Sequence, residues 1–213
     1  MNLTDRLKQG VVPLVAILRG LRPVEALDIG RALVEAGIRL IEVPLNSPEP
    51  LISIARLHAE FASEALIGAG TVLTASAVEA VAQAGGRLIV APNTEPPVIT
   101  RAHELGLDCL PGFLSATEAL CATRCGATSL KLFPASVVGT GYLKAIREVL
   151  PGNVEIWAVG GVGPQELPPW LAAGARGVGV GGSLYRPGDS AAAVAVRAAA
   201  LVDAWKHSVR GGE

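Results

Sequence analysis

The amino-acid sequence predicts an α/β protein folded as a single closed (β/α)₈ barrel, a TIM barrel, over residues 1–213. Short apolar segments alternate with helical segments eight times, which gives about 27 residues per unit. Half of the residues are hydrophobic but only 4% are aromatic, a composition typical of buried parallel strands and the helices that cover them. Glycines recur as helix ends at Gly37, Gly85, Gly106, Gly126 and Gly174.

In chain order, a short lead-in helix is expected first, over residues 2–9. Short apolar runs bounded by glycine or proline then predict eight strands, at residues 13–18, 39–43, 66–70, 88–91, 108–110, 129–133, 154–159 and 178–180. Eight helices are expected to follow these strands, at residues 23–36, 48–62, 75–84, 95–105, 115–126, 141–150, 164–173 and 190–209. The signals are prolines near helix starts, a capping box from Ser115 to Glu118, and glycines directly after helix ends.

This alternation predicts parallel strands joined by right-handed crossovers. An open doubly wound sheet is the alternative, but it usually carries a glycine-rich turn after the first strand. Residues 18–21, Leu-Arg-Gly-Leu, do not form such a turn. Since no linker or shift in composition divides the chain, a single domain is expected.

Charge and apolar patterning argue against nucleic-acid and membrane partners. The chain has 18 Lys and Arg against 19 Asp and Glu, and its basic residues form no stripe. Residues 11–18 resemble a signal peptide after Arg6 and Lys8, but Arg19 and Gly20 follow without a small-residue cleavage pattern. Three cysteines are an odd number, and they show no metal-ligand spacing with histidine. A reduced, cytoplasmic protein without metal is expected.

Lys131 is the first candidate catalytic residue. In a strand at 129–133, Ser129, Lys131 and Phe133 share one face, so the amine lies mid-strand beside an aromatic ring. The other three lysines fall on polar helical stretches. Loss of hydration lowers the pKa of a lysine, and the neutral amine is a nucleophile toward a ketone. The alternative is a structural lysine whose stem covers apolar surface while its ammonium reaches solvent.

Glu42 is the second candidate. It is the one carboxylate deep in an apolar strand near its C-terminal end, where barrel enzymes place their catalytic groups. Asp108 and Glu155 fall at strand starts, at the opposite end. A core acid bonded to neighbouring backbone is the alternative. One strand-buried lysine and one strand-buried glutamate aimed at a common cavity favour a catalytic pair.

Two glycine-rich segments, at residues 159–163 and 179–183, follow the seventh and eighth strands. Glycines there allow backbone N–H groups to approach a phosphate, and these loops are the usual phosphate site of such barrels. Arg19 ends the first strand and is placed to clamp a second anion or to tie down a loop. Thr71 and Pro92 close the third and fourth strands as site residues or as ordinary loop residues.

These motifs together resemble the class I 2-keto-3-deoxy-6-phosphogluconate aldolase family. The resemblance runs in register from about residue 13 to 185 through Glu42 and its flanks, residues 68–73, residues 131–134 and the two glycine-rich segments. It implies a homotrimeric barrel enzyme without metal or other cofactor, with Lys131 as Schiff-base lysine and Glu42 as general acid and base. It also implies a substrate site made by Arg19, Thr71, Pro92, Phe133, Val159, Gly160, Gly161, Gly182 and Ser183.

Two positions depart from the gluconate members, which usually carry Arg where this chain has Asn46 and Thr where it has Val159. Residues 42–48 with Val159 resemble the 6-phosphogalactonate branch instead. The resemblance thus implies cleavage of 2-dehydro-3-deoxy-6-phosphogalactonate to pyruvate and glyceraldehyde 3-phosphate, in galactonate catabolism. The gluconate substrate is the alternative within the family. A phosphosugar isomerase or epimerase that uses Glu42 as base, and a non-catalytic phosphometabolite binder, are alternatives from other classes.

Overall fold

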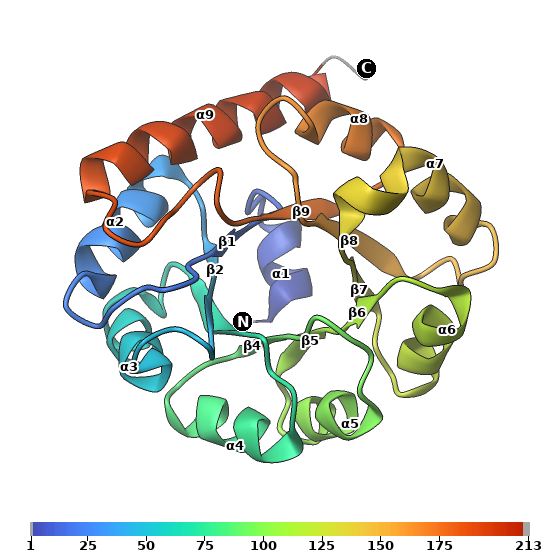
Figure 1. Ribbon diagram of the computed structural model, residues 1–213, viewed down its shortest axis with the longest axis horizontal. Helices are drawn as coiled ribbons and strands as arrows, with labels where there is room; N and C mark the ends of the chain where they lie inside the picture. The colour runs from blue at the N-terminus through green and yellow to red at the C-terminus, as the bar shows by residue number, and fades with distance from the viewer. Residues whose placement is uncertain (1, 211–213) are drawn as a thin grey trace.

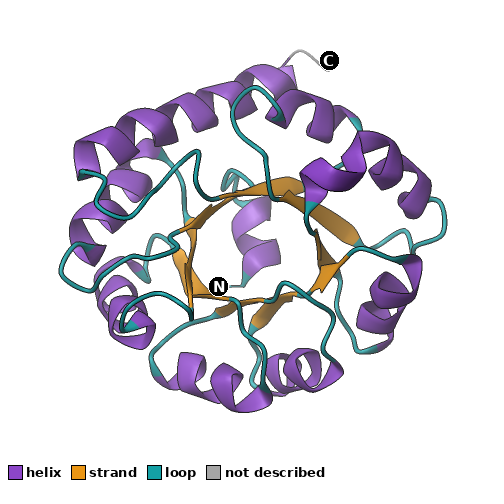
Figure 2. Cartoon of the chain, in the orientation of Figure 1, coloured by secondary structure: helices purple, strands orange, loops and turns teal. Residues whose placement is uncertain are grey.

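The computed structural model describes residues 2–210 of the protein. Strands and helices alternate around a central barrel (Figures 1 and 2). The strands are β1 (Leu14–Ile17), β2 (Leu40–Pro44), β3 (Leu66–Gly70), β4 (Leu88–Val90), β5 (Asp108–Leu110), β6 (Gly112–Phe113), β7 (Ser129–Leu132), β8 (Glu155–Val159) and β9 (Gly177–Val180). The helices are α1 (Leu3–Lys8), α2 (Ala26–Ala36), α3 (Pro50–Phe61), α4 (Ala75–Gln83), α5 (Pro96–Glu104), α6 (Ala116–Arg124), α7 (Ala135–Arg147), α8 (Leu167–Ala172) and α9 (Ala191–Arg210).

All strand pairs are parallel, in the order β5-β4-β3-β2-β1-β9-β8-β7-β6. The two ends of this order are consecutive in the chain, because only Pro111 separates β5 from β6. Proline has no N–H to donate, so the ladder is interrupted there, while its carbonyl accepts a 2.9 Å hydrogen bond from the Lys131 N–H. The prediction of eight strands is thus corrected to nine segments, of which β5 and β6 form one barrel strand in two pieces. The predicted TIM barrel is confirmed.

Two apolar clusters hold the barrel together. The larger one lies between the strands and the surrounding helices and includes Leu130 and Leu132 of β7. The smaller one fills the lower barrel interior with Leu3 and Leu7 of α1 and with residues from six of the strands, among them Trp157. Helix α1 lies across the opening of the ring of strands (Figure 2). The end of the barrel next to α1 is therefore closed by apolar side chains, so that a polar site is expected at the opposite end.

The predicted helix signals have the expected geometry. The five predicted glycine stops all have positive φ, from 64° at Gly106 to 98° at Gly37 and Gly174. The Ser115 hydroxyl accepts the Glu118 N–H, and the Glu118 carboxylate accepts the Ser115 N–H at 2.7 Å, which completes the capping box.

One predicted helix boundary was wrong. Helix α7 begins at Ala135, six residues before the expected start at 141, directly after the lysine strand. Gly139 has φ 73° and ψ 172°, a non-helical conformation that kinks the element there. The first turn of α7 therefore lies close behind the strand that carries Lys131.

Candidate active site

A cavity of about 490 Å³ opens at the C-terminal ends of the strands. All eleven residues that the sequence predicted for the site line this cavity: Arg19, Glu42, Thr71, Pro92, Lys131, Phe133, Val159, Gly160, Gly161, Gly182 and Ser183. They come from seven of the eight barrel units. This is the position at which TIM barrels carry their active sites.

Lys131 lies on the inner face of β7, opposite Gly112 of β6 and Trp157 of β8. Its side chain is only 6% exposed, and its Nζ lies 4.8 Å from the centre of the Phe133 ring. Burial lowers the pKa of this amine, and the Arg19 charge lowers it further, while the Glu42 carboxylate acts in the opposite direction. The lowered pKa makes the neutral, nucleophilic form of Lys131 more accessible than that of an ordinary lysine.

Glu42 lies on the inner face of β2 and is 2% exposed. Burial raises the pKa of its carboxyl to about 7, against the opposing charges of Lys131 and Arg19. Its Oε2 has no hydrogen-bond partner within residues 2–210. The carboxyl lies against β3 at Gly70, where a Cβ would collide with it, so that glycine makes room for the acid. A carboxyl with this pKa can both accept and return a proton near neutral pH.

Lys131 and Glu42 line the same cavity but form no direct ion pair in the described chain. Each shifts the pKa of the other, yet within the described chain no ion pair within 4.0 Å links them. A buried pair in direct contact would hold both groups charged. Their separation leaves room for a reacting molecule between amine and acid.

The rim of the cavity is formed by loops after the first three strands. Arg19 Nη1 donates a 2.6 Å hydrogen bond to Oδ1 of Asn46, and the Gly20 N–H donates to the hydroxyl of Ser47 at 2.9 Å. The β1 and β2 loops are thus tied to each other beside the cavity. Thr71, directly after β3, has φ 55°, a conformation that is strained for a β-branched residue.

The two glycine-rich loops meet on the side of β8 and β9. The Ser183 hydroxyl donates a 3.2 Å hydrogen bond to the Val162 carbonyl and links the loops. Within residues 2–210, the N–H groups of Gly161, Val162, Gly182 and Ser183 have no protein acceptor. Gly161 has φ 72° and packs so closely on Ser136 that a Cβ there would lie 2.7 Å from the hydroxyl. Free N–H groups from two loops form a cradle suited to an anion.

The cavity also contains six residues that the sequence reasoning did not select: Ile17, Val162, Gly163, Glu166, Gly179 and Gly181. The three glycines and Val162 belong to the predicted glycine-rich segments, and Ile17 belongs to the first strand. Glu166 lies in the helix predicted over residues 164–173. It is exposed, but its Oε2 accepts the Gly163 N–H at 3.0 Å, so it lies inside the anion cradle.

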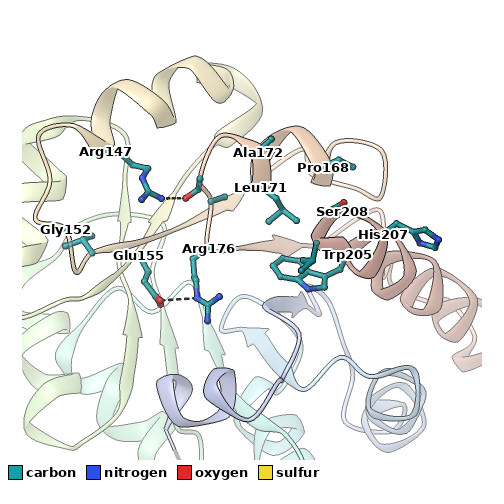
Figure 3. A pocket seen from close by; sticks show the side chains of 14 residues that line it. Arg147, Gly152, Glu155, Pro168, Leu171, Ala172, Arg176, Trp205, His207 and Ser208 are labelled. Carbon is teal, nitrogen blue, oxygen red and sulfur yellow. Dashed lines mark hydrogen bonds and ion pairs between the residues drawn. The ribbon is translucent and has the colours of Figure 1, made fainter. Parts of the chain in front are cut away.

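A larger cavity, of about 850 Å³, lies where β8 and β9 begin and α9 ends (Figure 3). Neither Lys131 nor Glu42 is among the residues that line it. Most of its polar side chains have partners within the protein. Glu155 and Arg176 form a 3.0 Å ion pair, Arg147 donates to the Gly174 carbonyl, and the Ser208 hydroxyl donates to the Ala204 carbonyl. The smaller cavity is therefore the candidate active site, because it combines the lysine and glutamate of shifted pKa with unused donors.

No group of three or more His, Cys, Asp or Glu side chains in residues 2–210 is placed to hold a metal ion. In the same residues, no helix has the length and apolar character needed to cross a membrane.

Two curated relatives match most of this chain. A protein of Rhizobium meliloti (strain 1021), called a probable 2-dehydro-3-deoxy-6-phosphogalactonate aldolase, is 50% identical over 94% of this chain and 94% of its own. The 2-dehydro-3-deoxy-6-phosphogalactonate aldolase of Escherichia coli (strain K12) is 46% identical over 95% of this chain and 98% of its own. The KHG/KDPG aldolase of the same strain is 28% identical, over 84% and 83%.

Solved structures agree with the sequence comparison. A native KDPGal structure superposes with a TM-score of 0.92 at 46% identity, over 93% of this chain and 97% of that one. A KDPG aldolase of Legionella pneumophila, with pyruvate captured as a covalent carbinolamine intermediate, superposes with a TM-score of 0.79 at 25% identity, over 93% and 94%. The family model described as KDPG and KHG aldolase matches residues 4–196. With this match and the close relatives, the chain belongs to the KDPG and KHG aldolase family.

Proposed function

We propose that this protein is a class I aldolase that cleaves 2-dehydro-3-deoxy-6-phosphogalactonate to pyruvate and glyceraldehyde 3-phosphate. The observation that carries the proposal is the pair of buried groups in one cavity: a lysine with lowered pKa and a glutamate with a pKa of about 7. Relatives at 46–50% identity carry the galactonate name, whereas the KHG/KDPG aldolase is at 28%. These identities favour the galactonate substrate over the gluconate epimer.

In the proposed first half of the reaction, the neutral amine of Lys131 attacks the C2 ketone. The carbinolamine loses water and becomes an iminium. Glu42 then takes the proton of the C4 hydroxyl while the C3–C4 bond breaks. The electron pair of that bond moves to the iminium, which becomes an enamine, and glyceraldehyde 3-phosphate leaves.

In the second half, the protonated Glu42 returns its proton to C3 of the enamine. Water hydrolyses the resulting iminium, which frees pyruvate and restores the amine of Lys131. The raised pKa of Glu42 suits both steps, because the same carboxyl must accept a proton and later release it.

Binding roles are assigned within the same proposal. Arg19, Thr71, Pro92 and Phe133 surround the pyruvyl part of the substrate, and Val159 faces its middle carbons. The phosphate binds at Gly160, Gly161, Gly182 and Ser183, where the free N–H groups of the two glycine-rich loops form the cradle. Support comes from the shared cavity and from the N–H groups there that have no protein acceptor in the described chain. No metal or other cofactor takes part in the proposed reaction.

We extend the proposal to a cytoplasmic homotrimer of single-domain subunits that acts in galactonate catabolism. Three large apolar side chains in the loops and helix starts after the strands are exposed: Val24 by 75%, Val137 by 74% and Leu73 by 50%. Apolar groups left in water favour association of subunits. Light scattering should give three times the mass of one chain, and the mass of a single chain would contradict the trimer.

Borohydride trapping tests the reaction class. The protein is incubated with pyruvate, reduced with borohydride and weighed by mass spectrometry. A Schiff-base aldolase gains one stable pyruvate adduct per chain, whereas a phosphosugar isomerase that uses Glu42 as base, or a simple binder, gains none. Cleavage of the galactonate acid in the same preparation then tests the substrate. Absence of an adduct would refute the proposed function.

A further inference from the structure

The phosphate cradle contains a negative charge that belongs to the protein. The Glu166 carboxylate lines the cavity and accepts the Gly163 N–H at 3.0 Å. Gly163 is next to Val162, whose carbonyl binds the Ser183 hydroxyl, so the carboxylate lies where the two glycine-rich loops meet. A Cβ on Gly163 would be 3.0 Å from Glu166 Oε2 and 3.6 Å from Ser183 Cβ. Glu166 thus takes one N–H donor of the region that would bind the phosphate.

No cation balances this charge at the cradle. Among the lining residues in the described chain, the cationic types are Arg19, bonded to Asn46 at the rim, and Lys131, whose pKa is lowered. Arg186 is next to the loop after β9, but its Nε donates to the Gly182 carbonyl at 3.0 Å and it does not line the cavity. A phosphate dianion would therefore meet backbone N–H groups, a hydroxyl and a carboxylate.

Resting on the proposed function, we infer that Glu166 sets the affinity of the site for the phosphate group. The carboxylate competes with the phosphate for the Gly163 N–H and repels it, since like charges at close range weaken binding. Phosphate-bearing ligands are held less tightly as a result, and the phosphorylated aldehyde leaves more easily. Glu166 acts on the phosphate and leaves the Schiff-base step at Lys131 untouched.

The test uses the full-length protein and inorganic phosphate as the probe, with binding measured by calorimetry at low ionic strength. Glu166→Gln keeps an oxygen acceptor for the Gly163 N–H and removes the charge. We expect its Kd for phosphate to fall by about fivefold, and the gain to shrink in ~0.5 M salt because the repulsion is screened. Glu148→Gln, which removes an exposed acid at the end of α7, is the matched control and should leave the Kd unchanged.

A second variant separates charge from loop order. Glu166→Ala removes both the charge and the hydrogen bond, and the competition model predicts tighter phosphate binding here too. Weaker binding in Glu166→Ala with no change in Glu166→Gln would overturn the inference, because the side chain would then only order the loop. In kinetics, we expect KM for the phosphorylated acid to fall in Glu166→Gln while the rate of pyruvate adduct formation stays constant.

The result is independent of the substrate assignment. If neither phosphorylated acid is cleaved but phosphate binds Glu166→Gln more tightly, the proposed function fails and the role of Glu166 stands. If cleavage proceeds and phosphate binding is the same in wild type and Glu166→Gln, the role of Glu166 fails alone.

Discussion

Arg19 and Asn46 meet across the rim of the cavity, where Nη1 of the arginine donates a 2.6 Å hydrogen bond to Oδ1 of the asparagine. The two residues follow β1 and β2, which are paired in the barrel, and both side chains are exposed. The bond holds the guanidinium beside the cavity. Asn46 is also a position at which the sequence departs from the gluconate members of the family, so this bond is a good place to test how the rim treats the substrate.

Asn46→Asp should weaken substrate binding. The new carboxylate would pair with Arg19 and compete with the anionic group of the substrate, so KM should rise by about tenfold with little change in kcat. Asn46→Ala removes the hydrogen bond without adding charge and should raise KM less. Steady-state kinetics on both variants makes the comparison. Wild-type KM in Asn46→Asp would show that Arg19 does not bind substrate.

Lys131→Arg should abolish both cleavage and the pyruvate adduct. A guanidinium stays protonated and cannot form an imine. Lys144→Arg, on the exposed face of α7, is the matched control and should keep full activity. Mass spectrometry after borohydride treatment reads out the adduct. An adduct on Lys144, or cleavage by Lys131→Arg, would refute the assignment of the nucleophile.

Glu42→Gln should still form the pyruvate adduct but lose about 10²–10⁴-fold in cleavage rate, because the amide cannot transfer the proton. In the wild type, kcat/KM should fall as the pH drops through about 7, where the Glu42 carboxyl becomes protonated. This acid limb should be absent in the variant. Normal exchange of pyruvate methyl protons in Glu42→Gln would mean that the residue is structural.

The raised pKa of Glu42 also makes the stability of the protein depend on pH, and Glu42→Gln should lack this dependence. The folded-state pKa of about 7 lies above the ordinary value of 4.5, so the folded protein binds the extra proton between these pH values. Proton binding by Glu42 therefore adds to the free energy of unfolding. This stabilisation is complete below about pH 4.5 and is lost as the pH rises through 7, a loss of up to ~3 kcal/mol. Urea unfolding at pH 5 and 7.5 should show the wild type losing free energy of unfolding relative to Glu42→Gln.

Val159→Thr should shift the choice between substrate epimers. Val159 is 5% exposed, lines the cavity next to the glycine-rich loop, and offers no hydrogen bond. A threonine there can bond the C4 hydroxyl of the gluconate epimer, and sites with such a buried contact discriminate strongly. The measurement is kcat/KM for both phosphorylated acids on both proteins. A wild type that prefers the gluconate acid would reject the galactonate assignment and leave the aldolase assignment intact.

Thr71→Gly should be more stable than Thr71→Ala by about 1 kcal/mol. Both variants lose the threonine side chain, but only glycine adopts φ 55° without strain. Thermal or urea unfolding gives the difference. Both should also show a raised KM if the threonine side chain contacts the pyruvyl group, whereas an unchanged KM in both would make Thr71 a loop residue only.

The sequence predicted the barrel well because its signals are local. Alternating apolar segments and glycine stops depend on neighbouring residues and fix the type and order of the elements. The break between β5 and β6 was missed, because a two-residue segment after Pro111 has too little apolar pattern to register as a strand. The early start of α7 was missed because Gly139 interrupts its helical pattern.

The site residues also divide into those with a local sequence signal and those without one. Lys131 and Glu42 could be found because a charged residue in an apolar strand stands out in one dimension. Glu166 could not, because its environment depends on a loop that folds its carboxylate back onto Gly163, three residues earlier. Spacing of three residues between an acid and a glycine is common in loops and carries no signal by itself.

The end of the barrel closed by α1 offers a practical site for attachment. Residue 2 caps α1 there, and the last turns of α9 line the cavity beside the first residues of β8 and β9, at the same end. The mouth with Lys131 faces the opposite way. A surface, a scaffold or a second enzyme joined near residue 2, or near the last described turn of α9, would therefore lie away from the substrate entrance.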